Sequence, residues 1–315
     1  MTRMVTAPAD SPAAPDTRPS RAPTGRGWSR NTVETRVLGV LRWIVIVGLA
    51  LFTLFPFYYM ALLSVRDLSS LLQEPARLWP LLSELTVGTY RDVLTPTESG
   101  GQGFVRFMAN SALIALGTVA VTLVFAVLGS YALARLRFPG RRRIGVLFLA
   151  VYLFPSILLA VPLFVFFTAL GLRGSLGPLV LVYVSQTIAV AIYTLRNYFQ
   201  TVPASIEEAA AVDGATRFTI MRKVTLPLAM PAILSNALFV FMIAWNEFLF
   251  ALLFLVEDRS RWTVSLGLSQ LAGSIEIPTT VLMAGSVILT LPIVILFFAT
   301  ERLLTGGLTA GAEKG

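Results

Sequence analysis

The chain of 315 residues is 56% hydrophobic and only 13% charged, with a mean hydropathy of +0.76. A soluble domain carries about a quarter charged residues, so this composition excludes an ordinary soluble protein. The sequence has a net charge of +8 and contains neither cysteine nor histidine. Their absence excludes thiol nucleophiles, disulfides, haem ligation and HExxH-type zinc sites. A GxxxxGK[ST] sequence is also missing, so the chain does not hydrolyse ATP through a P-loop of its own.

The first 35 residues differ from the rest, because prolines recur among Ala, Ser, Thr and Arg. Such a segment cannot bury enough apolar surface to fold, so we expect residues 1–35 to form a disordered cytoplasmic tail. A cleaved signal peptide is disfavoured, because the apolar run after Arg42 exceeds the usual length of about 7–15 residues. Residues 36–315 are then expected to form one transmembrane domain.

Six apolar runs are long enough to cross a bilayer core of roughly 30 Å. They cover residues 43–65, 108–134, 144–167, 177–195, 231–255 and 280–299. Pro56 predicts a kink in the first run, and the third carries Pro155 and Pro162. We therefore predict an all-α integral membrane protein with six transmembrane helices.

The basic residues indicate how the chain is oriented in the membrane. With the amino terminus inside, 18 of the 25 Lys and Arg residues lie on the cytoplasmic side. This positive-inside bias predicts that both termini are cytoplasmic, and it accounts for the basicity without a nucleic-acid partner. The same topology places the stretches 66–107 and 256–279 outside and makes 196–230 the largest internal loop.

That internal loop contains the run EAAAVDG, which predicts a short capped helix. Ser205 and Glu208 are spaced as a capping box, in which the Ser205 hydroxyl accepts from the Glu208 N–H and the carboxylate reaches back. Gly214 suits the left-handed position that ends a helix in a sharp turn. A second helix is expected from near Thr216, and Leu226-Pro227 marks the return to the membrane. The loop is thus predicted to be two short helices folded about Gly214.

The residues of this loop are compatible in part with two other structures. One is a cytoplasmic helical hairpin without a partner, which the residues alone leave open. The other is a helix-turn-helix that reads DNA, which is disfavoured because the first helix is acidic and both ends are tethered to membrane helices.

The loop resembles the coupling loop of permease subunits in ATP-driven (ABC) importers, with the signature EAAx3Gx9IxLP and Val224 in place of isoleucine. Pro203 and Asp213-Gly214-Ala215 narrow the resemblance to carbohydrate importers. The ending GLTxGxxKG is similar to that of the maltose- and trehalose-type "G" permease. Further similar segments are Asn110-Ser111, 131–135, 138–140 and 244–247. The resemblance covers roughly residues 38–315.

This resemblance implies a type I ABC importer permease fold in the bacterial cytoplasmic (inner) membrane. It also implies a heterodimer with a second permease, two ATPase subunits that bind ATP and Mg, and an extracytoplasmic sugar-binding protein. The chain itself would bind no cofactor and catalyse no reaction. Residues implied in ATPase coupling are Ser205, Glu207, Glu208, Ala209, Ala210, Asp213, Gly214, Ala215, Leu226 and Pro227. A tail reaching between the ATPases would contribute Gly307, Leu308, Thr309, Gly311, Lys314 and Gly315. The substrate stays open, because maltose, trehalose, other oligosaccharides, amino sugars and glycerophosphate-type polyols all use this type of permease.

Polar residues within the apolar runs are candidates for a translocation path: Tyr183, Ser185, Gln186, Asn236, Asn246 and Glu247. The alternative for most of them is helix–helix hydrogen bonding, and for Glu247 an interfacial position at the outer mouth. An ion-coupled secondary transporter or a channel without an ATPase is the alternative function. One glutamate in six spans argues against a proton relay, and a channel leaves the acidic loop unexplained.

Overall fold

The computed structural model describes residues 30–274 and 276–312, so most of the predicted tail 1–35 lies outside the described residues. The chain divides into two compact units, residues 1–55 and 56–315. The described part of the first unit belongs to helix α1, Arg30–Val65, which contains Pro56. Apart from one isolated bridge between Arg66 and Leu85, the described residues form helices and connections, as the sequence predicts.

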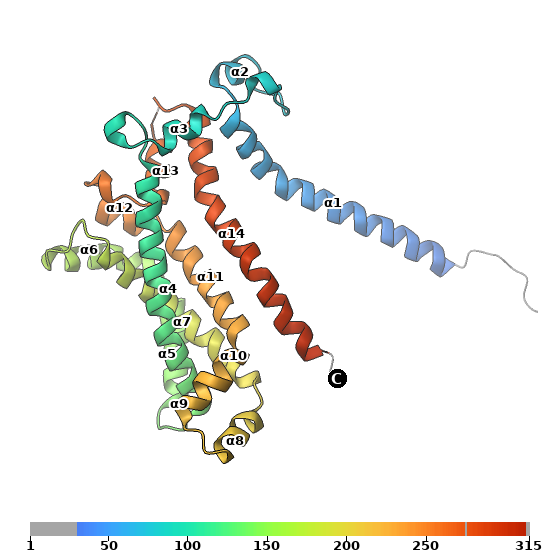
Figure 1. Cartoon of the computed structure of the whole chain (residues 1–315), viewed down its shortest axis with the longest axis vertical. Coiled ribbons are helices and arrows are strands. Elements are labelled where there is room, and N and C mark those ends of the chain that lie inside the picture. Colours follow the sequence, from blue (N-terminus) through green and yellow to red (C-terminus); the bar gives the residue numbers. More distant parts are fainter. Residues whose placement is uncertain (1–29, 275, 313–315) are drawn as a thin grey trace, which may run out of the picture. The chain divides into compact units, whose positions relative to one another are not determined.

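The second unit is a bundle in which α4, Phe104–Arg135, α7, Gly177–Thr201, and α11, Met230–Asn246, lie side by side (Figure 1). Helix α14, Thr279–Ala312, packs against α11. Small residues allow close packing between α4 and α7, because Gly117 meets Val180 and Gly129 meets Ile192. These four helices are the main packed elements of the second unit.

Within the described residues, four helices are long and apolar enough to cross a membrane: α1, α4, α7 and α14. Two bent pairs of helices also qualify, and they raise the number to six when each pair is counted as one span. The first pair joins Arg141–Leu153 to Ser156–Ala169 at 82°, and the second joins Arg217–Leu228 to Met230–Asn246 at 75°. This upper number equals the six spans of the sequence prediction, although the second pair includes Arg217–Leu228, which the prediction assigned to the internal loop.

The predicted third span is broken near its middle. Helix α5, Arg141–Leu153, is followed by a 3₁₀ turn, η3, Ser156–Leu159, and by α6, Ala160–Ala169. Phe154 is extended, with ψ 127°, because the ring of Pro155 disfavours a helical conformation in the residue before it. A continuous helix over 144–167 was therefore wrong, and the break turns α6 away from α5.

The predicted fifth span is also interrupted. Helix α11 ends at Asn246, Glu247 is extended with ψ 130°, and α12 covers Leu249–Leu255. Beyond a 3₁₀ turn, η5, Arg259–Arg261, helix α13, Val264–Ala272, buries much of its surface against α4 and α14. A Cβ at Gly267 would lie 2.5 Å from the Phe107 ring, so glycine is needed there. Residues 256–272 of the predicted external stretch are thus ordered into short helices, and α13 packs against the bundle.

Residues 66–103, predicted as an external loop, are ordered into short elements. These are α2, Leu68–Gln73, η1, Leu82–Glu84, α3, Gly88–Leu94, and η2, Thr97–Ser99. Arg66 is buried at their centre, where its Nη2 donates to the carbonyls of Ser70 at 3.0 Å and Glu74 at 2.9 Å. The hydroxyl and N–H of Ser69 donate to the Asp67 carboxylate and lower the pKa of Asp67 below its usual value.

The last helix is longer than the sequence predicts, although its part that qualifies as a membrane span ends at Glu301. We expected it to stop before Glu301 and to leave a free tail, whereas α14 continues to Ala312. The backbone of Gly307, Leu308, Thr309 and Gly311 therefore belongs to this helix. Lys314 and Gly315 lie outside the described residues.

Candidate functional site

A helical hairpin closes one end of the bundle, between α7 and α11 (Figure 1). It consists of α8, Ala204–Val212, the short helix α9, Arg217–Ile220, a π-helical turn, η4, Met221–Thr225, and α10, Leu226–Leu228. Thr216 caps α9, because its hydroxyl accepts from the N–H of Thr219 at 3.3 Å. The two-helix arrangement and the start of the second helix agree with the sequence prediction.

Gly214 forms the turn of this hairpin. It has a φ of +83°, the left-handed conformation predicted for it. Its N–H donates to the Ala211 carbonyl at 3.0 Å, and the Ala215 N–H donates to the Ala210 carbonyl at 3.0 Å. This pair of bonds is the Schellman motif, which satisfies the last carbonyls of α8. Asp213 is the C-cap residue, so the predicted end of the helix is confirmed.

The predicted capping box at the start of α8 was wrong. The helix begins at Ala204 with Pro203 as its N-cap, and no side chain caps its first turn. Proline has a fixed φ and presets the chain to enter a helix directly after it, so Ser205 is already inside the helix. Ile206 then occupies the third helical position, where a capping acid would act, and Glu208 lies two positions beyond it.

Glu207, the first of the two adjacent acids, is turned into the protein. Its Oε1 accepts from Arg135 Nε at 2.8 Å and from the Thr225 hydroxyl at 2.9 Å. Arg135 also donates to the Val202 carbonyl at 2.8 Å. The side chains of Arg135 and Glu207 are only 15% and 13% exposed. One partly buried carboxylate therefore ties α8 to the end of α4 and to η4. No local sequence pattern indicates this contact, because Arg135 and Glu207 are 72 positions apart.

The opposite surface of α8 has no partner among the described residues. Ser205, Glu208, Ala209 and Val212 recur at i, i+3, i+4 and i+7, so they share one face, and all four are exposed. Val212 is 88% exposed, and Phe218 on α9 is 65% exposed. An exposed face with small and apolar side chains and one acid is suited to contact with another protein.

The hairpin is anchored at its far end by Leu226, which packs onto a buried cluster with Tyr131, Phe199 and Met221. The π-helical turn η4 ends two residues before Pro227. Proline lacks an N–H and so cannot continue the α-helical bond pattern, and a wider turn absorbs this defect. The chain turns by 75° at Ala229, directly after α10, and continues into α11.

A second feature is a cavity of about 690 Å³ at the level of the apolar spans. It lies between the broken third span, α7 and α11. Its polar lining residues include Tyr152, Ser156, Ser185 and Gln186. The aromatic side chains that line it are Tyr152, Phe154 and Phe239. Tyr152, Ser156 and Gln186 make no side-chain hydrogen bond to any other described residue. The cavity therefore combines aromatic rings with free polar groups.

The predicted path residues do not all gather there. Gln186 and Ser185 line the cavity. Asn236 is buried and bonds to Thr194 at 2.6 Å and to the Ala232 carbonyl at 2.8 Å. Asn246 donates to the Met242 carbonyl at 2.9 Å. Asn236 and Asn246 thus make the contacts expected from helix–helix and helix-internal bonding.

Glu247 and Tyr183 form a pair at the break in the fifth span. The Tyr183 hydroxyl donates to Glu247 Oε2 at 2.6 Å. The same carboxylate accepts from the N–H groups of Phe250 at 2.9 Å and Ala251 at 3.3 Å. Glu247 therefore caps the start of α12 and links it to α7. A carboxylate at a helix N-terminus is favoured by the helix dipole.

We expect Glu247→Ala to lower the free energy of unfolding by about 2 kcal/mol, because it removes a helix cap and leaves the Tyr183 hydroxyl unpaired. Thermal unfolding of the detergent-solubilised protein measures this effect. Glu257→Ala is the matched control, since Glu257 is 67% exposed in its pair with Arg173 and should change stability by less than about 1 kcal/mol. Equal losses in the two variants would contradict a capping role for Glu247.

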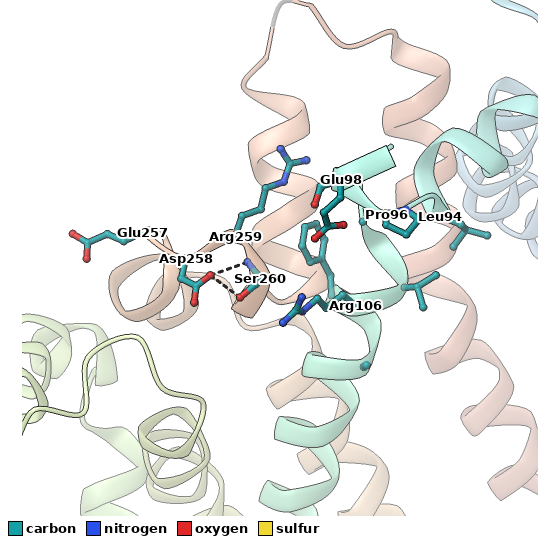
Figure 2. A pocket seen from close by; sticks show the side chains of 13 residues that line it. Leu94, Pro96, Glu98, Arg106, Glu257, Asp258, Arg259 and Ser260 are labelled. Atoms are coloured by element: carbon teal, nitrogen blue, oxygen red, sulfur yellow. Dashed lines mark hydrogen bonds between the residues drawn. The ribbon is translucent and has the colours of Figure 1, made fainter. Parts of the chain in front are cut away.

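A third cavity, of about 580 Å³, lies at the end of the bundle opposite the hairpin. Figure 2 shows Glu98 and Arg106 on one wall and Asp258, Arg259 and Ser260 on the other. The Ser260 hydroxyl donates to Asp258 at 2.6 Å and lowers the pKa of Asp258 below its usual value. This charged cavity is open to solvent and is separate from the one at the apolar level.

Residues 125–306 match the family described as "Binding-protein-dependent transport system inner membrane component". The inner membrane ABC transporter permease protein YcjP of Escherichia coli K12 is 39% identical, over 85% of this chain and 95% of that protein. The trehalose/maltose transport system permease protein MalG of Thermococcus litoralis is 37% identical, over 91% of this chain and 99% of that protein.

Among solved structures, the chain is similar to one from a bacterial ABC transporter involved in the import of the acidic polysaccharide alginate. The TM-score is 0.72 and the sequence identity is 26%, with 88% of this chain and 99% of that chain covered.

Proposed function

This chain belongs to the family of inner membrane components of binding-protein-dependent transport systems, the permease subunits of ABC importers, and on that premise we propose that it imports a sugar. The sugar is proposed because MalG is named for trehalose and maltose and the similar solved transporter for alginate. The protein is a multi-pass component of the inner membrane, in line with its apolar spans.

We propose that the hairpin receives the motion of an ATPase subunit. The observation that carries this proposal is the geometry of α8: Glu207 fixes one side of the helix to α4, and the other side is exposed. A helix held in this way moves as a rigid part of the bundle, which is what transmission of a domain movement requires. Glu208 and Val212, on the exposed face, are proposed to enter a groove of the ATPase.

The proposed assembly contains this chain, a second homologous permease, two ATPase subunits that bind ATP and Mg, and an extracytoplasmic sugar-binding protein. The hairpin and both termini are assigned to the cytoplasm, because 18 of 25 basic residues then lie inside. The charged cavity at the opposite end then faces outward. It is a candidate contact for the binding protein, since charged clefts steer association with partners.

The experiment that tests this function is an affinity purification of the tagged chain from its native membrane, with the bound proteins identified by mass spectrometry. Recovery of an ATPase, a second permease and a binding protein is the expected result. Glu208→Lys should reduce the recovered ATPase, because it reverses the charge of the exposed face. A chain recovered alone in mild detergent, yet active in uptake without ATP, would favour the ion-coupled alternative.

The cavity at the apolar level is proposed as this chain's part of the translocation path. Sugar hydroxyls need hydrogen-bond partners in a region without water, and sugar rings pack on aromatic side chains. Tyr152, Ser156 and Gln186 can supply the hydrogen-bond partners. Phe154 and Phe239 can supply the aromatic surfaces. The break at Pro155 supports this role, since irregular backbone at membrane depth is tolerated where it lines a cavity.

We expect Gln186→Ala to raise the KM for uptake about five- to tenfold, which corresponds to one lost hydrogen bond, with maximal ATP hydrolysis unchanged. Initial uptake rates in proteoliposomes measure this. Gln200→Ala is the control, because Gln200 is the other glutamine of α7, is exposed, and does not line the cavity. An unchanged KM in Gln186→Ala would remove this side chain from the path.

A further inference from the structure

A cavity of about 410 Å³ lies where the start of α5 meets the last turns of α7, near the end of the bundle that carries the hairpin (Figure 1). Three arginines line it: Arg141, Arg142 and Arg196. Its other walls are formed by Gly145, Val146, Leu149 and Tyr193, so no carboxylate is among the described residues that line it. Three positive charges thus face one small space without a counter-charge.

Arg196 is the most unusual of the three. Its Nε is buried and has no hydrogen-bond partner in the described part of the chain. A Cβ at Gly145 would lie 3.0 Å from Arg196 Nη1, so the guanidinium is seated directly against the backbone of α5. An unpaired buried donor is costly, and the usual reason for its presence is a partner that is not part of the chain.

The beginning of α5 adds to this positive potential. Its first turn consists of Arg141, Arg142 and Arg143 without an acid, and Gly140, with φ +84°, provides no side-chain cap. The free N–H groups of a first turn carry a partial positive charge. Basic side chains beside them add electrostatic repulsion, and a bound anion would offset it. Arg141 is held in place by the carbonyls of Ala134 at 3.2 Å and Leu136 at 3.4 Å. Within the described residues, Arg142 forms no hydrogen bond or ion pair through its side chain.

The remaining walls point to the kind of anion. Val146 and Leu149 are 61% and 42% exposed and belong to an apolar span, so they offer an apolar surface next to the arginines. Tyr193, which is 44% exposed, adds a polar hydroxyl to the lining of the cavity. The cavity therefore has a cationic end at the polar boundary of the membrane and an apolar flank that continues along α5. This combination matches a lipid, with a charged headgroup and acyl chains, better than it matches a free ion.

We infer that this cavity binds the phosphate headgroup of an anionic phospholipid, with Arg142 and Arg196 as the principal ligands. Guanidinium groups suit phosphate because they present paired donors in a planar fork. Basic pockets between transmembrane helices on the cytoplasmic side are established sites for anionic headgroups. The cavity is joined to the end of α4, because Arg141, which lines it, donates to the carbonyls of Ala134 and Leu136 on either side of Arg135. The site is independent of the transported substrate and goes beyond the proposed function.

The test is native mass spectrometry of the full-length protein in detergent, titrated with dioleoylphosphatidylglycerol or dioleoylphosphatidylcholine. The wild-type protein should retain the anionic lipid preferentially. Arg196→Gln should weaken its binding about fivefold, and Arg142→Gln with Arg196→Gln about 25-fold, as expected for roughly 1 kcal/mol per basic residue. Arg143→Gln is the matched control, because Arg143 is the next residue of the same turn, is exposed and does not line the cavity.

Three results would overturn the inference. One is equal affinity of the wild type and the double variant for the anionic lipid. Another is an equal loss in Arg143→Gln, which would indicate general attraction to a basic surface. The third is displacement of the lipid by inorganic phosphate in millimolar excess, which would assign the cavity to a free anion. Elution volume and thermal unfolding of each variant establish that it is folded, and none of these measurements depends on sugar uptake.

Discussion

Replacing Gly214 by proline is expected to leave membrane insertion intact and to abolish the coupling of ATP hydrolysis to transport. Gly214 has a φ of +83° and donates its N–H to Ala211, and proline can do neither. Proline also disfavours the helical conformation of Asp213, which has ψ 6°. Loss of the Schellman motif should cost about 3 kcal/mol locally and turn α8 away from its position beneath α4. Uptake and ATP hydrolysis, measured together in proteoliposomes of the assembled transporter, report this uncoupling.

Substitution by asparagine provides the control for this experiment. Asparagine tolerates the left-handed conformation and keeps the N–H, so Gly214→Asn should retain most of the transport. A Cβ at this position meets nothing within 4 Å, so the comparison is not confused by a steric clash. Coupled uptake at the normal rate in Gly214→Pro would show that the hairpin does not transmit the motion.

The second large effect is expected at the brace between α4 and α8. Arg135→Ala removes the closest cation from Glu207, whose side chain is 13% exposed, and also removes a donor to the Val202 carbonyl. A buried carboxylate without its partner costs about 3 kcal/mol, so both the melting temperature and transport should fall. Arg137→Ala is the matched control, because Arg137 is exposed and lies two residues further along the same segment.

A double-mutant cycle separates loss of the charge pair from loss of packing. Combining Arg135→Ala with Glu207→Ala leaves no unpaired charge, so the double variant should be more stable than Arg135→Ala alone. Transport should stay low in the double variant, because α8 has lost its attachment to α4. Additive losses of stability would mean that Arg135 and Glu207 do not act as a pair.

Where the sequence predictions succeeded, the signals were local. The apolar runs predicted the spans because a helix that crosses lipid needs about 20 consecutive apolar residues. The hairpin followed from Gly214 and Thr216, because a left-handed residue and an N-cap act on bonds within a few positions. The errors were of two kinds. Pro203 started α8 earlier than the capping box implied, and breaks at Phe154 and Glu247 divided runs whose composition is continuous.

The amino-acid sequence by itself determined that this is a helical membrane protein with an exposed hairpin, because hydropathy, proline and glycine act along the chain. The tertiary structure alone decided which of two adjacent acids points inward, since the choice of Glu207 depends on Arg135 in a distant helix. It also decided that Glu247 is held by Tyr183 and that three arginines of α5 and α7 share one cavity. These features arise from contacts between helices that are far apart in sequence, and local patterns carry no information about such contacts.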